Sequence, residues 1–140
     1  MPRIIAFDLG RKSLGIATTD SLLISAHGYE EYRFPDGAFQ DATKHAIEVI
    51  KKENVLEICV GLPLHMSGEE SKSSESARHF AKDLEIALPN VKVSLVDERM
   101  TTIIANNRLL EADLSRKKRK EVIDKMSAVV ILESYLNQRR

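Results

Sequence analysis

Residues 6–20, AFDLGRKSLGIATTD, place a carboxylate and a glycine directly after an apolar run. The run Ile4–Phe7 ends at Asp8, and Gly10 follows shortly after it. A carboxylate at the end of a buried strand is costly in free energy unless something cationic compensates it. The glycine allows a tight turn and close approach by another backbone or a ligand. Asp8 is therefore a candidate for cation binding, although Asp before Gly is also ordinary turn chemistry.

The spacing of apolar residues predicts an α/β protein. We expect strands at 3–8, 13–19 and about 24–33, a helix at about 37–53, a strand in EICVGLPL that stops at Pro63, a helix at about 70–88, a strand at 91–96, and helices at about 100–112 and 116–137. The short spacings between the first three strands favour antiparallel hairpins. Two right-handed crossovers then make the first, fourth and fifth strands parallel neighbours, in a mixed five-stranded sheet flanked by helices. The carboxyl ends of those strands are where such a sheet presents its site.

Composition excludes several classes of protein. The chain has 140 residues, 43% of them hydrophobic, which suits one domain over 1–140 with a real core. Lys and Arg together number 21, as do Asp and Glu, so the net charge does not indicate a nucleic-acid partner. A single cysteine, Cys59, rules out a disulfide within one chain and fits a reducing compartment. Since neither a signal-peptide pattern nor a membrane-spanning stretch is evident, we expect a cytoplasmic protein.

Acidic residues at two further places in the sequence resemble Asp8. Asp97 and Glu98 close a second apolar strand, and Asp124 interrupts an apolar helical face. Because neighbours on a strand point to opposite faces, only one of Asp97 and Glu98 can converge with Asp8. We assign the longer Glu98 to the metal and Asp97 to a structural role, either pairing with Arg99 or capping the next helix. Three carboxylates aimed at one end of a sheet are what a divalent-metal site for phosphodiester chemistry requires.

Asp124 shares a helical face with apolar residues. Ala128 and Ile131 lie four and seven positions further on, which places all three on one face. An Asp aimed toward a core is rare unless it is paired or bound to a cation. The small Ala128 would let the helix lie close to the sheet and bring Asp124 toward the strand ends. The alternative is an Asp at the helix edge that pairs with Lys120 or Lys125.

A basic run opens the last predicted helix. It consists of Arg116, Lys117, Lys118, Arg119 and Lys120, and it follows Ser115, a natural N-cap. Charge runs are commonly solvated faces, but cations in a first helical turn oppose the helix macrodipole. Stability therefore does not explain the run, whereas contact with phosphate does. Arg11, Lys12, Arg99 and Arg108 could extend this basic patch around the acidic site.

The polar segment SGEESKSSES, residues 67–76, joins a predicted strand to a predicted helix. Ser67 and Glu70 have the spacing of a capping box, which predicts a surface loop that runs into a capped helix. The alternative is a flexible loop that handles substrate beside the site. His65 is the only histidine expected near the site, and the four histidines show no metal-ligand spacing with one another.

Four ordered motifs resemble those of a known family. They are AFDLGRKSLGIATTD at 6–20, VGLPLHMSG at 60–68, DERMTT at 97–102 and SRKKRKEVIDKMSAVVILESYL at 115–136. With these motifs the chain resembles the YqgF family, also called RuvX-like, a bacterial branch of the RNase H-like nucleases. The resemblance runs nearly end to end.

The resemblance implies an RNase H-like fold, a divalent metal and cleavage of a phosphodiester. Matched by motif, the acidic residues of the family correspond to Asp8, Glu98 and Asp124, which would be both catalytic and metal-binding. Arg99, Thr102 and the basic run match the rest of its pattern and would contact nucleic acid. Members are described as nucleases that mature the 5′ end of pre-16S rRNA in ribosome biogenesis, and earlier as Holliday-junction resolvases. Two ions, Mg²⁺ or Mn²⁺ for an oxygen-only site, would activate a water and stabilise the leaving oxygen, with substrate phosphate completing their ligands.

Three alternatives stay open. Residues 6–20 also resemble the first phosphate-binding hairpin of actin-like ATPases and sugar kinases, but those need two such domains and this chain supplies one. A non-catalytic RNA-binding module on a decayed nuclease fold would not need all three acids. A DNA junction resolvase needs two sites related by a dyad, and no apolar stripe distinguishes a homodimer from a monomer. We expect a nucleic-acid partner, either pre-rRNA or branched DNA, with ribosomal precursor particles as a further partner and no membrane partner.

Overall fold

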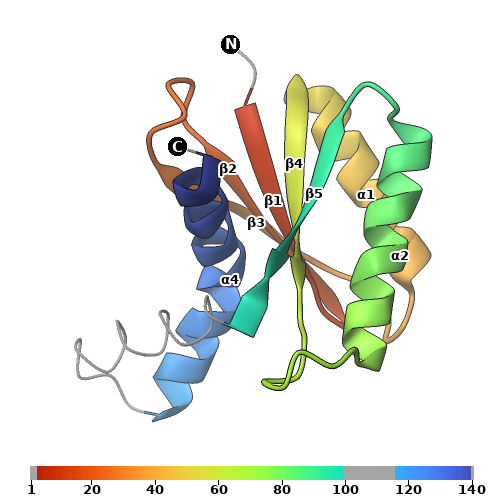
Figure 1. Cartoon of the computed structure of the whole chain (residues 1–140), viewed down its shortest axis with the longest axis vertical. Coiled ribbons are helices and arrows are strands. Elements are labelled where there is room, and N and C mark those ends of the chain that lie inside the picture. Colours follow the sequence, from red (N-terminus) through yellow and green to blue (C-terminus); the bar gives the residue numbers. More distant parts are fainter. Residues whose placement is uncertain (1–2, 100–115, 140) are drawn as a thin grey trace.

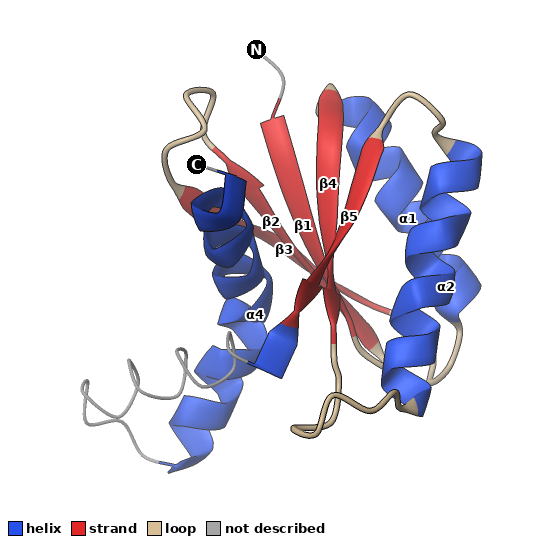
Figure 2. Ribbon diagram, in the orientation of Figure 1, coloured by secondary structure: helices blue, strands red, loops and turns tan. Residues whose placement is uncertain are grey.

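The computed structural model describes residues 3–99 and 116–139, apart from the side chains of Leu56 and of residues 116–126. A central sheet lies between two layers of helices (Figure 1, Figure 2). Helices α1 (Phe39–Lys52) and α2 (Lys72–Ala87) cover one face, and helix α4 (Arg116–Arg139) covers the other. Within the described part of the chain, no helix combines the length and the apolar character that crossing a membrane requires.

Five strands form one mixed sheet in the order β3-β2-β1-β4-β5. Their bounds are β1 (Arg3–Leu9), β2 (Ser13–Thr19), β3 (Ala26–Arg33), β4 (Val55–Leu62) and β5 (Lys92–Asp97). Strand β2 pairs antiparallel with β1 and β3, while β4 pairs parallel with β1 and β5. The predicted fold class is therefore confirmed, including the antiparallel order of the first three strands. The helix predicted at about 100–112 lies outside the described residues.

Alternation along β1 divides the core between the two faces of the sheet. Ile5 and Phe7 are fully buried on the face covered by α1 and α2, where Phe7 meets Phe80 edge to face with ring centroids 5.8 Å apart. Ile4 and Ala6 belong to the second apolar cluster, which includes α4. Since successive side chains on a strand point to opposite faces, a strand covered on both sides has to be apolar throughout. The apolar run near the start of the chain is therefore the buried centre of the sheet.

Helix α2 is not capped by the predicted pair, Ser67 and Glu70. Its N-cap is Ser71, whose hydroxyl oxygen accepts the N–H of Ser74 at 3.1 Å, while the Ser74 hydroxyl oxygen accepts the N–H of Ser71 at 2.6 Å. Serine at the third helical position thus makes the reciprocal bond that the usual pattern assigns to Glu or Gln. Glu70 lies before the helix and pairs with Arg78 at 2.6 Å. The capping prediction is wrong because Ser71 and Ser74, a pair with the same spacing four residues further on, form the capping box instead.

The C-terminal half of α4 is tied to the sheet by one carboxylate. Glu57 of β4 accepts hydrogen bonds from the Tyr135 hydroxyl and from Nε of Arg139, the latter at 3.2 Å. Burial raises the pKa of Glu57, but these two donors outweigh burial, and the net effect is a lowered pKa. Anchored there, α4 extends along the sheet toward the edge where β1, β4 and β5 end, so that its N-terminal half lies at that edge (Figure 1).

Candidate active site

Two acids from distant parts of the chain meet where the parallel strands end. Strands β1, β4 and β5 are parallel neighbours, so their carboxyl ends share one edge of the sheet. Asp8 lies near the end of β1, and Glu98 directly follows the end of β5. Asp8 lies near enough to Glu98 to raise the pKa of the Glu98 carboxyl group. The topology alone therefore brings together two of the three acids that the sequence singled out.

The environment of this pair disfavours two free negative charges. Burial raises the pKa of Glu98 to about 9, and the charge and the hydrogen bond of Asp8 act in the same direction. Two carboxyl groups so placed either share a proton or take up a cation. Both are oxygen donors, the kind of ligand that Mg²⁺ and Mn²⁺ prefer. The Asp8–Glu98 pair therefore fits a hard divalent cation.

Gly61, inside β4, makes room for Glu98. A Cβ atom at position 61 would lie 2.8 Å from Cδ of Glu98 and 2.6 Å from Cδ1 of Ile131 in α4. Both distances are shorter than van der Waals contact, so any side chain here would displace the glutamate or the isoleucine. Gly61 was not among the predicted site residues, although a glycine inside an apolar strand is a known sign of close approach.

Helix α4 comes close to the sheet beside Asp8. Asp8 pairs in register with Gly15 of β2, and a Cβ atom at position 15 would lie 3.6 Å from the Cβ atoms of both Asp8 and Ala128. Ala128 is almost fully buried, in agreement with its predicted place on the core-facing stripe of the helix. Asp124 lies about one helical turn before Ala128. Its side chain is outside the described part of the structure.

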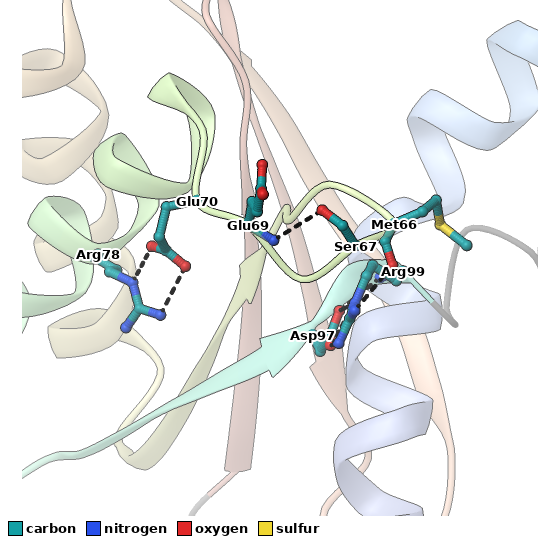
Figure 3. Close-up of polar contacts among 7 residues, drawn as sticks. All are labelled: Met66, Ser67, Glu69, Glu70, Arg78, Asp97 and Arg99. Atoms are coloured by element: carbon teal, nitrogen blue, oxygen red, sulfur yellow. Dashed lines mark hydrogen bonds and ion pairs between the residues drawn. The ribbon is translucent and has the colours of Figure 1, made fainter.

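Asp97, the neighbour of Glu98, is paired with Arg99 (Figure 3). Strand β5 ends at Asp97, and the backbone is helical at Glu98 and Arg99. The Asp97 carboxylate accepts hydrogen bonds from Nε of Arg99 at 2.9 Å and from Nη2 at 2.6 Å. The Arg99 guanidinium lowers the pKa of Asp97. The structure thus shows the pairing with Arg99 that the sequence offered as one role for Asp97.

The other predicted residues are only partly described. Arg11 is 77% exposed and pairs with Asp36 at 2.9 Å, and Lys12 is exposed in the same turn between β1 and β2. The basic run 116–120 forms the start of α4, but its side chains are not described. Thr102, Arg108 and Ser115 also lie outside the described residues. Among the described residues, no three His, Cys, Asp or Glu side chains are grouped so that they could hold a metal ion.

Comparison with known proteins identifies the family. The family profile RuvX, described as a Holliday junction resolvase, matches residues 2–138. The chain belongs to the RuvX family. A protein of Halalkalibacterium halodurans named "Putative pre-16S rRNA nuclease" is 41% identical over 138 residues, covering 99% of this chain and 98% of that protein. One of the same name from Bacillus subtilis is 42% identical over 135 residues, covering 96% of this chain and 97% of that protein.

The fold of this RuvX-family chain is similar to that of RuvC from Thermus thermophilus. A structure of RuvC in complex with a Holliday junction substrate has a TM-score of 0.61 at 13% identity, covering 99% of this chain and 96% of RuvC. A second RuvC structure has a TM-score of 0.60 at 14% identity, covering 98% of this chain and 95% of RuvC. At such identities the similarity concerns the fold alone. It confirms the RNase H-like class that the four motifs indicated.

Proposed function

We propose that this RuvX-family protein is a divalent-metal-dependent nuclease that hydrolyses RNA phosphodiesters in maturation of the 5′ end of pre-16S rRNA. The observation that carries the proposal is the pair of neighbouring acids, Asp8 and Glu98, at the carboxyl ends of parallel strands. The family assignment, the names of the relatives and the RuvC-like fold support a hydrolase that acts on phosphodiester bonds. The proposed setting is the cytoplasm, with ribosomal precursor particles as partners.

Three acids would hold the cation, Mg²⁺ or Mn²⁺. They are Asp8 and Glu98, which the structure brings together, and Asp124, which precedes Ala128 by about one turn of α4. When bound, such an ion supplies Lewis-acid stabilisation at the phosphoryl oxygens and lowers the pKa of a coordinated water. The protein contributes the fixed negative charges and a partly desolvated setting in which those charges act strongly.

Other residues of the chain would orient the acids and the nucleic acid. Gly61 lets Glu98 lie close to β4, and the fully buried Ile131 of α4 lies against the same glycine. The basic run 116–120, at the start of the same helix, would neutralise phosphates beside the scissile bond. Further proposed contacts with nucleic acid come from Arg11, Lys12 and Thr102. The acids would then act on a nucleic-acid backbone that basic residues have already positioned.

A DNA junction resolvase is the second candidate, and the description of the matching family profile favours it. Resolution of a four-way junction needs two acidic sites related by a dyad, and hence a homodimer. Hydrolysis of pre-rRNA makes no such demand, so a monomer is sufficient. Both candidates use the same acids, and they differ in the substrate and in the oligomer.

The 5′ end of 16S rRNA in depleted cells tests the proposed function. We expect the precursor end to accumulate, wild-type protein to restore the mature end, and Asp8→Asn to fail. Glu85→Gln, a change at an exposed position of α2, serves as the matched acidic control and should restore it. A normal 5′ end in depleted cells would refute the proposal. Unresolved DNA junctions in those same cells would favour the second candidate.

A further inference from the structure

We propose that Asp97 and Arg99 are positioning residues. Together they hold the turn at Glu98 and the β4–α2 loop, residues 63–71, in a fixed position relative to each other, an arrangement that we call the brace. This inference rests on the proposed function, because it concerns residues that flank the acidic pair. It also gives Arg99 a role different from the phosphate contact that the sequence motif suggested.

Asp97 fixes the backbone on both sides of Glu98. Its Oδ1 accepts the backbone N–H of Arg99 at 3.0 Å, which closes a short turn around the glutamate. Asp97 itself is the last residue of β5 and pairs in register with Leu62 of β4. Glu98 therefore lies between two anchored residues. Because its carboxyl group has little free space beside Gly61, a small rotation of this turn would change its position relative to Asp8.

The Arg99 guanidinium joins this turn to the β4–α2 loop (Figure 3). While Nε and Nη2 donate to Asp97, Nη1 donates to the carbonyl oxygen of Met66 at 3.3 Å. Gly68 lies against the same group, since a Cβ atom at position 68 would be 3.3 Å from Nη1. The φ of Gly68 is +92°, a conformation that side-chain-bearing residues rarely adopt. The loop is therefore folded closely around the guanidinium.

These contacts engage every nitrogen of the guanidinium with a protein acceptor. Each of its three nitrogens donates to Asp97 or to the Met66 carbonyl, and the Arg99 side chain is 31% exposed. Arg11, in contrast, is 77% exposed. Arg11 is also paired with a carboxylate, that of Asp36, but its side chain is much more open to solvent. At Arg99 a phosphate could use the second N–H of Nη1 and of Nη2, on a side chain that the turn and the loop hold in place. The planar arginine fork suits a two-point bond to a carboxylate, which lysine cannot make.

Four variants distinguish a brace from a phosphate contact. They are Asp97→Asn, Arg99→Gln, Arg99→Lys and, as the matched control, Arg78→Gln. Arg78 makes a similar two-point pair with Glu70 of the same loop, at 2.6 and 3.2 Å, but it lies on α2 (Figure 3). The control thus removes an arginine pair from the loop without touching the turn that holds Glu98.

Cleavage kinetics give the first readout. We expect Asp97→Asn and Arg99→Gln to lower kcat with Mg²⁺ by about 10- to 100-fold, with little change in KM, as is usual when a partner of a metal ligand is lost. Arg99→Lys should be as impaired as Arg99→Gln, because the two-point bond is missing in both. The slope of log Kd against log salt should stay at the wild-type value. Arg78→Gln should keep the wild-type kcat.

Hydrogen exchange gives a second readout that needs no cleavage. The N–H of Gly68 donates to the carbonyl oxygen of His65 at 2.7 Å, and the N–H of His65 donates to that of Glu69 at 3.0 Å. Both amides should exchange faster in Asp97→Asn and in Arg99→Gln than in wild type or in the control. A wild-type protein that cleaves no nucleic acid would refute the proposed function and leave this test of the brace in place.

Three results would overturn the brace. Loop amides that exchange at the wild-type rate would show that Arg99 does not hold the loop. Faster exchange with a wild-type kcat would show that the turn does not position Glu98. A salt slope that falls by about 0.7 to 0.9 in Arg99→Gln and recovers in Arg99→Lys would show a phosphate contact instead. If Arg99→Gln does not fold, Asp97→Asn decides the matter by kcat and exchange.

Discussion

Replacing Glu98 with glutamine should stabilise the metal-free protein at neutral pH. Burial and Asp8 raise the pKa of Glu98 from 4.5 to about 9 in the folded protein, whereas the unfolded chain releases this proton near the ordinary value. Since the folded state then binds more protons than the unfolded chain, wild-type stability falls as the pH rises through the window between these values. The variant has no titrating group at this position, and its amide can still donate a hydrogen bond to Asp8.

The expected gain in stability of Glu98→Gln follows from the pH range between the pKa of Glu98 in the unfolded chain and its pKa in the folded protein. Each pH unit between the two pKa values lowers wild-type stability by about 1.4 kcal/mol. By pH 7 the wild type has therefore lost at most about 3 kcal/mol of stability. The actual loss is smaller, because the structure around the acid pair relaxes. The difference in unfolding free energy, variant minus wild type, should therefore grow from about 1 kcal/mol or less at pH 5 to about 2 or 3 kcal/mol at pH 7.

Urea unfolding in EDTA, repeated across this pH range, measures the difference directly. Glu85→Gln, at an exposed position of α2, is the control and should show no comparable dependence on pH. Adding Mg²⁺ should stabilise wild type and not the Glu98 variant, since a ligand stabilises only the folded form that binds it. If Glu98→Gln is no more stable than wild type and the difference does not grow with pH, the reasoning about a buried, protonated acid pair is refuted.

Two further changes probe the surroundings of the pair. Changing Lys117, Lys118 and Arg119 to Gln should lower the slope of log Kd against log salt for RNA by about 2 to 3 while leaving thermal stability unaltered or raised, because cations at a helix start oppose the macrodipole. Normal RNA binding with easier unfolding would mean that the run is structural. Gly61→Ala should lower stability by about 1 to 3 kcal/mol through overpacking and should reduce cleavage by shifting Glu98, as unfolding and kinetic measurements would show. Wild-type cleavage in this variant would contradict the tight packing at Gly61.

The fold could be predicted from the sequence because the signals that set it are local. An apolar run that is buried on both sides, as at Ile4–Phe7, has few places other than the centre of a sheet. The short spacings around β2 permit hairpins, and the longer ones that follow require crossovers. The cap of α2 was missed because Ser67 and Ser71 both meet the local rule, and only the path of the loop chooses between them.

Less of the candidate site could be predicted from the sequence. The different roles of Glu98 and Asp97 could be predicted, since adjacent residues at a strand end point in different directions, and in the structure Glu98 lies near Asp8. The bond from Arg99 to the Met66 carbonyl has no signature in the sequence, because a backbone oxygen is present at every residue and its direction depends on the loop. The roles of the third acid and of the basic run stay predictions, since their side chains lie outside the described structure.

Cleavage by the purified protein tests the central claim most directly. With a labelled RNA that spans the 5′ precursor junction of 16S rRNA, we expect cleavage in Mg²⁺ or Mn²⁺ and poor cleavage in Ca²⁺, whose larger size and looser geometry suit the chemistry less well. Asp8→Asn, Glu98→Gln and Asp124→Asn should each abolish cleavage, and EDTA should abolish it in wild type. Cleavage that survives EDTA, or full activity in Asp8→Asn, would contradict a metal-dependent nuclease built on the Asp8–Glu98 pair.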